Sequence, residues 1–261
     1  MFSEGAFEGK VAFITGGSGY IGSTFCRKFV SLGGKCILVD KVENKSVGSE
    51  PGLGNGSCLF LKCDLLDPLQ RQTTVDKVKE IFLKVDIVIN NASYTGDSNL
   101  DGWVEEFEKQ SLEAWTRALE VNLTAAFDFC QRLVPLLKKS ESPSIINIGS
   151  IYGTLGPDFS LYENTKMGNP VAYGVSKAGL HQLTKYLAVV LAPDIRVNSI
   201  SPGGLERGQP DSFKEKYIQK TPMRRMATED DVVNAILFFS SDLAGYITGQ
   251  NLLVDGGLSI S

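Results

Sequence analysis

The sequence predicts one α/β domain built on a doubly wound parallel sheet. Short apolar runs recur along the chain, each suited to a buried parallel strand. Helical segments separate these runs, and this alternation is typical of doubly wound sheets, whose ligands bind at the carboxyl ends of the strands. The 261 residues include 43% hydrophobic ones, enough for one large core. We therefore expect a single domain over residues 1–261.

The first strand, Lys10–Thr15, leads into Gly16-Gly-Ser-Gly-Tyr-Ile-Gly22 and a helix to about Leu32. Glycines between a strand and a helix permit a tight turn and let backbone N–H groups approach a pyrophosphate. An ordinary strand-to-helix turn is the alternative. The phosphate-binding hypothesis assigns cofactor contacts to Gly16, Ser18, Gly19, Tyr20, Ile21 and Gly22.

The second strand, Lys35–Asp40, ends in a carboxylate. An acid at this point accepts hydrogen bonds from the adenosine ribose hydroxyls of a dinucleotide and repels a 2′-phosphate. The sequence therefore favours NAD over NADP, although Lys41 keeps NADP as the alternative. Asp40 could also be a simple cap. Residues 43–57 are rich in glycine and predict a mobile surface loop.

Further strands follow at Cys58–Asp64 and Val85–Asn90, with a helix beginning near Asp67 between them. A polar loop over 94–111 precedes a long helix from Leu112 to about Lys138. The later strands are expected at 144–150, 194–201 and within 249–257, with helices at about 171–191 and 229–240.

The centre of the chain carries the groups suited to proton transfer. Ser150 ends an apolar strand, and Tyr173-Gly-Val-Ser-Lys177 opens a helix. A tyrosine and a lysine four residues apart project from the same helix face. A cation held there stabilises phenolate and lowers the tyrosine pKa from about 10 toward the working pH. Such a tyrosine can move a proton on or off an alcohol oxygen.

These residues resemble the single-domain branch of the short-chain dehydrogenase/reductase family, with motifs in the family's order over nearly the whole chain. The resemblance implies a Rossmann-like sheet of seven parallel strands. It also implies that Ser150 holds the substrate oxygen, Tyr173 exchanges its proton, and Lys177 lowers the tyrosine pKa and binds the nicotinamide ribose. Asn122, in Glu-Val-Asn-Leu, would distort its helix and hold a water that relays protons. A packing role is the alternative for Asn122.

A second Tyr-x-x-x-Lys pair, Tyr162 and Lys166, competes for the catalytic role. It follows Ser150 by about a dozen residues, which is the family's usual spacing. However, Gly168 and Pro170 would stop a helix almost at once. We therefore assign the role to Tyr173.

The glycine turn departs from the single-domain branch, which usually has glycine where this chain has Tyr20. The spacing of Gly16, Gly19 and Gly22 is closer to the extended branch, which includes nucleotide-sugar epimerases and dehydratases. The resemblance assigns other cofactor contacts by position, although Asp64 could be only a helix cap. These contacts are Asp64 and Leu65 at the adenine, Asn91, Ala92 and Ser93 near the nicotinamide ribose, and Pro202 and Gly203 beside the nicotinamide.

Two segments are expected on the substrate side. An insertion over about 152–171 would contribute Tyr152 and Tyr162, and a lid over about 203–225 would contribute Gly204 and Arg207. From Leu205 to Arg225, six basic residues against three acidic ones leave a local charge of +3. The lid therefore predicts an anionic substrate, with a solvated amphipathic helix as the alternative.

The resulting prediction is an NAD-dependent oxidoreductase acting on a secondary alcohol or ketone. The segments around Ser150 and Tyr162 resemble dehydrogenases associated with flagellin glycosylation and surface-polysaccharide assembly, which implies a sugar-derived substrate. Two alternatives stay open: an epimerase or dehydratase that uses NAD without net turnover, and a non-catalytic NAD-binding regulator.

Composition sets the remaining expectations. The net charge of −4 supports neither nucleic acid nor an anionic membrane as a partner. Five scattered cysteines without metal-ligand spacing predict reduced thiols and no metal site. No signal peptide or membrane segment is visible, which predicts a cytoplasmic protein. We expect a homodimer or homotetramer formed through the two long helices, and a surface or subunit-contact position for His181.

Overall fold

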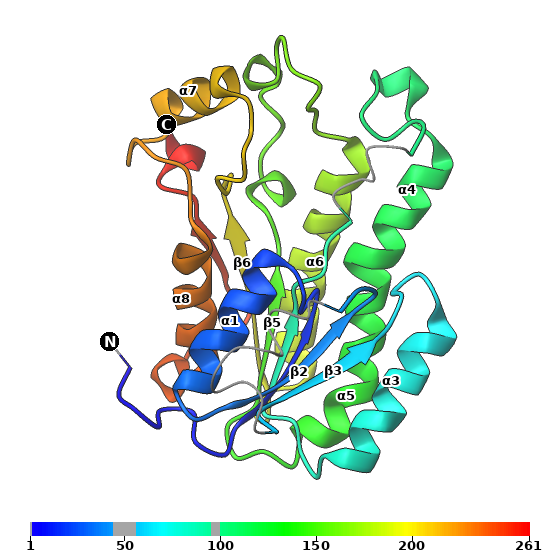
Figure 1. The fold of residues 1–261 in the computed structure, drawn as a ribbon, viewed down its shortest axis with the longest axis vertical. Coiled ribbons are helices and arrows are strands. Elements are labelled where there is room, and N and C mark those ends of the chain that lie inside the picture. Colours follow the sequence, from blue (N-terminus) through cyan, green and yellow to red (C-terminus); the bar gives the residue numbers. More distant parts are fainter. Residues whose placement is uncertain (1, 44–55, 95–99) are drawn as a thin grey trace.

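The computed structural model describes residues 2–43, 56–94 and 100–261. Within them, seven parallel strands form one sheet in the order β3-β2-β1-β4-β5-β6-β7 (Figure 1). This confirms the predicted doubly wound fold. The expected loop over 43–57 lies mostly outside the described residues. The strands are β1 (Val11–Thr15), β2 (Lys35–Asp40), β3 (Cys58–Lys62), β4 (Ile87–Asn90), β5 (Ser144–Ile148), β6 (Arg196–Pro202) and β7 (Asn251–Val254).

Helices cover both faces of the sheet (Figure 1). On one face α1 (Tyr20–Ser31) and α8 (Glu229–Ser240) pack against the strands. On the other face lie α3 (Pro68–Ile81), α5 (Ala125–Leu137) and α6 (Val171–Val190). Because both faces are covered, every residue of the central strands β1, β4 and β5 is buried. Short 3₁₀ turns are η1 (Phe107–Lys109), η3 (Ile151–Gly153), η4 (Phe159–Leu161), η5 (Asp242–Ala244) and η6 (Leu258–Ile260).

The strand order places a crevice beside β1. This strand has β2 on one side and β4 on the other, so the connections to its two neighbours diverge at its carboxyl end. Beyond that end lie α4 (Leu112–Leu119) and α7 (Asp211–Lys220), as Figure 1 shows.

The prediction of a single long helix over 112–138 is wrong in detail. The structure divides it into α4 and α5, joined by one π-helical turn, η2 (Glu120–Thr124). Asn122 lies in this turn with its side chain buried. Its Oδ1 accepts from the Tyr94 N–H at 2.6 Å, and its Nδ2 donates to Ser176 Oγ at 2.9 Å. The distortion therefore falls at the asparagine, as the resemblance implied.

The prediction that His181 lies at the surface is wrong. His181 is 9% exposed, and its Nε2 lies 2.8 Å from Ser201 Oγ on β6. It follows Lys177 by one helical turn, so both face the sheet. Gly149 lies against the imidazole, since a Cβ built on this glycine would approach Nε2 to 2.3 Å. His181 is thus a packing residue beneath the segment that carries Ser150.

The five cysteines are free thiols. Cys26 on α1 and Cys58 on β3 have their Sγ atoms 3.1 Å apart. Among residues 2–43, 56–94 and 100–261, no group of His, Cys, Asp and Glu side chains could hold a metal ion. In the same ranges, every helix is too short or too polar to cross a membrane.

Candidate active site

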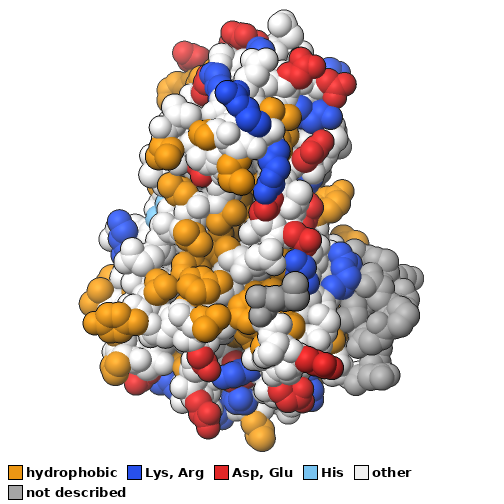
Figure 2. Space-filling view, turned by 90° about the vertical axis from the view of Figure 1, so that its left-hand side faces the viewer, with side chains coloured by type: hydrophobic (Ala, Val, Ile, Leu, Met, Phe, Trp, Pro, Cys, Tyr) orange, Lys and Arg blue, Asp and Glu red, His pale blue; other side chains and the backbone are white. Residues whose placement is uncertain are grey.

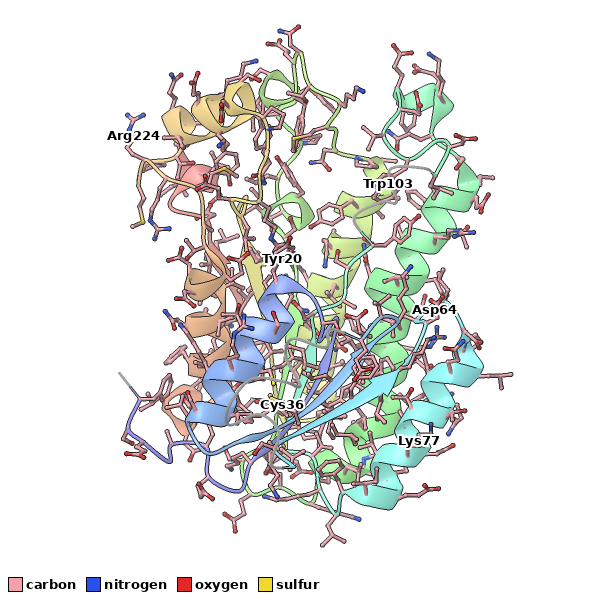
Figure 3. All side chains as sticks on the ribbon, viewed as in Figure 1. Tyr20, Cys36, Asp64, Lys77, Trp103 and Arg224 are labelled. Atoms are coloured by element: carbon pink, nitrogen blue, oxygen red, sulfur yellow. The ribbon has the colours of Figure 1, made fainter. Side chains whose placement is uncertain are left out.

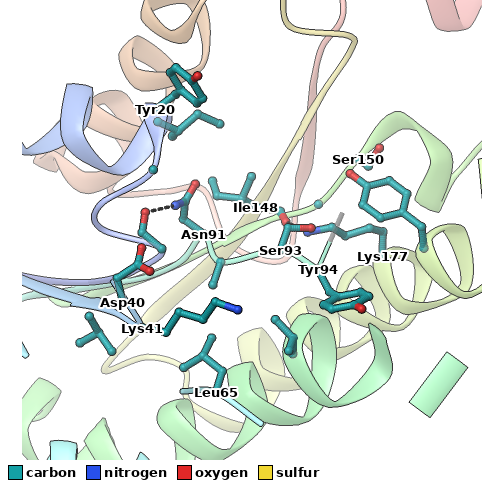
Figure 4. Close-up of a pocket in the computed structure, with 18 of the residues that line it drawn as sticks. Tyr20, Asp40, Lys41, Leu65, Asn91, Ser93, Tyr94, Ile148, Ser150 and Lys177 are labelled. Atoms are coloured by element: carbon teal, nitrogen blue, oxygen red, sulfur yellow. Dashed lines mark hydrogen bonds between the residues drawn. The ribbon is translucent and has the colours of Figure 1, made fainter. Parts of the chain in front are cut away.

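A cavity of about 440 Å³ lies at the carboxyl ends of the central strands (Figure 4). It runs from Asp40 at the end of β2 to Tyr173 on α6. It brings together most of the predicted cofactor and catalytic residues. These are Gly16, Gly19, Tyr20, Ile21, Asp40, Lys41, Asp64, Leu65, Asn91, Ala92, Ser93, Ser150, Tyr173, Lys177, Pro202, Gly203 and Arg207.

The glycine turn forms the wall of this cavity at the start of α1. Gly16 has a φ of +66°, and a Cβ there would approach Ala92 Cα to 2.9 Å. A Cβ on Gly22 would lie only 2.3 Å from Gly16 O, so the helix could not pack against the turn. The α1 N-terminus has neither a side-chain cap nor an acidic residue in its first turn. Its N–H groups are therefore suited to an anion, and the turn fits a dinucleotide pyrophosphate.

Asp40 is held at the far end of the cavity by backbone donors. Its Oδ2 accepts from the Ser18 N–H at 3.1 Å, and its Oδ1 accepts from the Val42 N–H at 3.3 Å. Lys41 lies beside it in the cavity wall (Figure 4). The carboxylate is thus placed to meet ribose hydroxyls, with a cation alongside.

The Asp40 assignment predicts a change in cofactor preference. Replacing Asp40 by serine should weaken NAD binding about 10- to 100-fold, because a charged hydrogen-bond acceptor is lost. The same change removes the repulsion of a 2′-phosphate, so the ratio of kcat/KM for NADP to that for NAD should rise. Asp40→Asn, which keeps an acceptor but loses the charge, should lie between. An unchanged ratio in both variants would count against the assignment.

The turn after β4 is fixed to β1 by Thr15, a residue that the sequence analysis did not single out. Its Oγ1 accepts from the N–H groups of Asn91 and Ala92, each at 3.1 Å. Asn91 Nδ2 in turn donates to the Thr15 and Gly16 carbonyls, at 2.9 and 3.1 Å (Figure 4). The only signal in the sequence is a hydroxyl residue at the end of a buried strand. This network holds Ser93 at the cavity.

Tyr173 and Lys177 lie one turn apart on α6, which confirms the predicted helix. Both project into the cavity, with Lys177 Nζ 5.8 Å from the centre of the Tyr173 ring. Lys177 is 1% exposed, and its Nζ donates to the Ile148 carbonyl at 2.7 Å. Burial lowers the pKa of Lys177 to about 7. Burial therefore favours the neutral amine of Lys177 over the ammonium.

Burial raises the pKa of Tyr173 above its ordinary value, and three nearby groups oppose this rise. The opposing groups are the hydroxyls of Ser150 and Ser93 and the charge of Arg207. That Lys177 lowers this pKa stays a prediction.

The two serines lie at the catalytic end of the cavity (Figure 4). Ser150 follows β5 and is the N-cap of η3. Its Oγ accepts a hydrogen bond from the Tyr152 N–H at 3.2 Å. The Ser93 Oγ is buried without a well-oriented hydrogen-bond partner. It nevertheless lies near enough to Tyr173 to favour the phenolate. A buried polar atom of this kind fits a site that receives a polar ligand.

The competing pair does not share a helix. Tyr162 directly follows the short turn η4, and Lys166 lies in irregular chain beyond it. The Tyr162 hydroxyl instead meets the Tyr152 hydroxyl at 2.8 Å. Both tyrosines line a neighbouring cavity of about 1080 Å³. The structure therefore keeps them outside the cavity that holds Tyr173.

Gly204 also lies outside that cavity. It lines a third one, and its N–H donates to Tyr217 Oη at 2.5 Å. That donor is therefore already used within the protein. The remaining predicted residues that do not line the main cavity are Ser18, Gly22 and Asn122.

The positive charge of the lid is largely neutralised by ion pairs. Arg224 lies at the outer edge of the molecule and donates to the Gln219 carbonyl (Figure 3). Because the other basic side chains of the segment have carboxylate partners, the solvated-helix alternative gains support over the anion-attracting lid. These pairs are Arg207–Glu229, Lys214–Asp211, Lys216–Glu163, Lys220–Asp158 and Arg225–Asp231.

The fold and the site define a dehydrogenase of the Rossmann type. The glycine turn, the acid at the end of β2, and the Tyr173–Lys177 pair beside Ser150 occupy one cavity. A family model described as enoyl-(acyl carrier protein) reductase matches residues 18–259. The chain belongs to the short-chain dehydrogenase/reductase family and is an oxidoreductase.

Curated relatives match the chain over almost its whole length. The 3-oxoacyl-[acyl-carrier-protein] reductase FabG of Escherichia coli is 32% identical over 258 residues, which cover 97% of this chain and 98% of that protein. The post-translational flagellin modification protein A of Campylobacter coli is 32% identical over 254 residues, covering 96% and 98%. Sequence identity alone does not separate these two relatives.

Solved structures support the fold. A short-chain dehydrogenase from Leptospira borgpetersenii with bound NAD⁺ has a TM-score of 0.87 and 33% identity, covering 100% of this chain and 97% of that one. The aldohexose dehydrogenase of Thermoplasma acidophilum has a TM-score of 0.81 and 26% identity, covering 98% and 96%.

Proposed function

We propose that this protein is an NAD-dependent dehydrogenase that transfers hydride between the cofactor and a secondary alcohol or ketone of a sugar-derived substrate. The observation that carries the proposal is one continuous cavity with Asp40 at one end and Tyr173, Lys177 and Ser150 at the other. The bound NAD⁺ of the Leptospira relative supports the choice of cofactor.

In this proposal, different residues along the cavity bind different parts of the cofactor and the substrate. Asp40 binds the adenosine ribose, the α1 N-terminus binds the pyrophosphate, and Lys177 binds the nicotinamide ribose. When bound, the nicotinamide of NAD would accept the hydride during oxidation and return it during reduction. Ser150 holds the substrate oxygen, and Tyr173 takes its proton as a general base during oxidation or returns it during reduction.

In this proposal the side chain of Asn122 does not itself hold the relay water. Both ends of its side-chain amide are engaged, by the Tyr94 N–H and by Ser176 Oγ. A relay water near Lys177 would therefore use a backbone oxygen of the π-helical turn. The side chain acts as a positioning group that ties this turn to α6.

The substrate assignment rests on the tyrosines that follow Ser150. Tyr152 comes two residues after Ser150, and its hydroxyl meets that of Tyr162. Burial raises the pKa of both hydroxyls, so they stay neutral and can donate as well as accept hydrogen bonds. Such groups suit a sugar, which presents hydroxyls of the same kind. The flagellin-modification relative agrees with a role in surface glycan biosynthesis, whereas the FabG relatives point to acyl substrates.

We also propose that the protein is a cytoplasmic homodimer or homotetramer. Exposed apolar side chains follow the helices α4, α5 and α6, including Leu112, Phe127, Val171, Val175 and Val189. Figure 2 shows hydrophobic side chains gathered on a different face as well, the one that carries α8. The five free thiols suit a reducing compartment.

The substrate proposal is tested by the change in nicotinamide absorbance, with NAD and NADP in parallel. The panel comprises neutral sugars, sugar phosphates, nucleotide sugars, sugar acids and a 3-oxoacyl thioester. We expect turnover with NAD on a sugar-derived compound. Turnover on the thioester alone would contradict the proposal.

With that substrate, Tyr152→Phe should raise KM about 3- to 10-fold, as expected for one lost hydrogen bond to a hydroxyl. The kcat should change little, because Tyr152 does not touch the reacting oxygen. Tyr246→Phe is a matched control, since Tyr246 is fully exposed. An unchanged KM in Tyr152→Phe would remove this residue from the substrate site.

A further inference from the structure

A cation–π contact joins the glycine turn to the lid. Tyr20 is the first residue of α1, and its side chain is 65% exposed. Arg207, far along the chain, places its Cζ 4.6 Å from the centre of the Tyr20 ring. Both residues line the main cavity. The separation lies within the range of about 6 Å over which a guanidinium is attracted to an aromatic face.

The Arg207 guanidinium is held from one side only. Its Nε donates to Glu229 Oε1 at 3.2 Å, at the N-terminal end of α8. The Arg207 N–H donates to Gln209 Oε1 at 2.7 Å, which fixes the backbone of the same turn. Within the described part of the chain, Nε is the guanidinium nitrogen that forms a hydrogen bond. The two terminal amino groups are thus left to meet a ligand in the cavity.

The surroundings of these amino groups favour an anion with several oxygens. They lie beside Tyr20 and hence beside the uncapped N-terminus of α1. A guanidinium can bind two phosphate oxygens at once, and the helix N-terminus offers further N–H donors. Glu229 contacts Nε at 3.2 Å, so the two terminal amino groups can still bind an anion beside this ion pair.

We propose that Arg207 binds the pyrophosphate of the dinucleotide against the N-terminus of α1, and that Tyr20 is the platform that holds the guanidinium there. This changes the expected role of Arg207 from the substrate to the cofactor. It also assigns a function to Tyr20, which replaces the usual glycine of the turn. The lid segment would then be anchored over the cofactor through one side chain.

Binding measurements without substrate test this role. NADH, ADP-ribose and adenosine are titrated separately against the full-length protein. Arg207→Met should weaken the binding of NADH and ADP-ribose about 10- to 100-fold, because a charged phosphate contact is lost. Adenosine, which lacks the pyrophosphate, should bind as before. Arg224→Met is the matched control, since Arg224 lies on the outer edge of the same segment, and it should leave all three affinities unchanged.

The platform is tested by a second pair of variants. Tyr20→Phe keeps the ring and should bind NADH like the unmodified protein. Tyr20→Leu should weaken NADH binding about 2- to 5-fold, as expected for a partly exposed cation–π contact. Combining Tyr20→Leu with Arg207→Met should add little to the loss in Arg207→Met alone, because the two residues act as one unit.

Two results would overturn the proposal. One is an Arg207→Met variant that binds NADH and ADP-ribose normally but shows a raised substrate KM, which would return Arg207 to the substrate. The other is an equal loss for adenosine, which would indicate a general distortion of the cavity. Thermal unfolding of each variant establishes that the affinities belong to folded protein.

Discussion

Replacing Tyr173 by phenylalanine should lower kcat about 10²- to 10⁴-fold, the usual contribution of a general acid/base. The ring would remain to fill its place on α6, so the fold should persist and NADH affinity should change by only a few-fold. The loss arises because no other hydroxyl on α6 is placed beside Ser150 to exchange the substrate proton. The measurement is the steady-state rate with NAD and the identified substrate, beside a titration with NADH.

The second Tyr-x-x-x-Lys pair supplies the control for this experiment. Tyr162→Phe should retain kcat within a few-fold and act chiefly on KM, because Tyr162 contacts Tyr152 and lies outside the main cavity. The opposite pattern, with Tyr162→Phe inactive and Tyr173→Phe active, would show that spacing from Ser150, rather than helix position, marks the catalytic tyrosine.

Replacing Lys177 by methionine should abolish most activity and yet stabilise the protein at neutral pH. Burial lowers the pKa of Lys177 from 10.5 to about 7, so folding must partly neutralise this group. Methionine avoids that cost but leaves the Ile148 carbonyl without its 2.7 Å donor. We expect a net gain of about 1–3 kcal/mol at neutral pH, after subtracting the lost hydrogen bond. This corresponds to a rise in Tm of about 2–10 °C.

The sign of the pH dependence distinguishes this explanation from better packing alone. Between the folded and unfolded pKa values, the unfolded chain binds the proton more tightly, so Lys177 makes the stability of the unmodified protein rise with pH. The advantage of Lys177→Met should therefore be largest at pH 7 and below and should shrink toward pH 10.5. Thermal unfolding across this range measures it, with Lys185→Met, an exposed lysine of the same helix, as the control. A stability difference that is independent of pH would contradict the explanation.

The fold and the cofactor end of the site could be predicted because their signals are local. A buried strand is a short apolar run, and a phosphate-binding turn is a set of glycines between a strand and a helix. The positions of Gly16 and Asp40 follow from these runs directly. The parallel sheet then brings the strand ends to one edge without any knowledge of side-chain contacts.

The parts that sequence could not supply depend on contacts between distant segments. The local charge of the lid treats Lys216 and Lys220 as unpaired, yet their partners Glu163 and Asp158 come from the insertion before α6. His181 shares a helix face with Lys177, but its depth depends on Gly149 and on Ser201 of β6. The low pKa of Lys177 likewise reflects complete burial, which a helical pattern does not reveal.

Net oxidation or reduction is the central claim, and the stoichiometry of cofactor and product tests it most directly. NAD is mixed with the best substrate of the panel, NADH is followed by its absorbance, and the product is identified by mass. We predict that one NADH accumulates for each product molecule and that the product is lighter than the substrate by two hydrogen atoms. A product that forms without accumulation of NADH would contradict this and would assign the protein to the redox-neutral isomerases or dehydratases. Tight NAD binding with no product from any compound would contradict it in favour of a non-catalytic role.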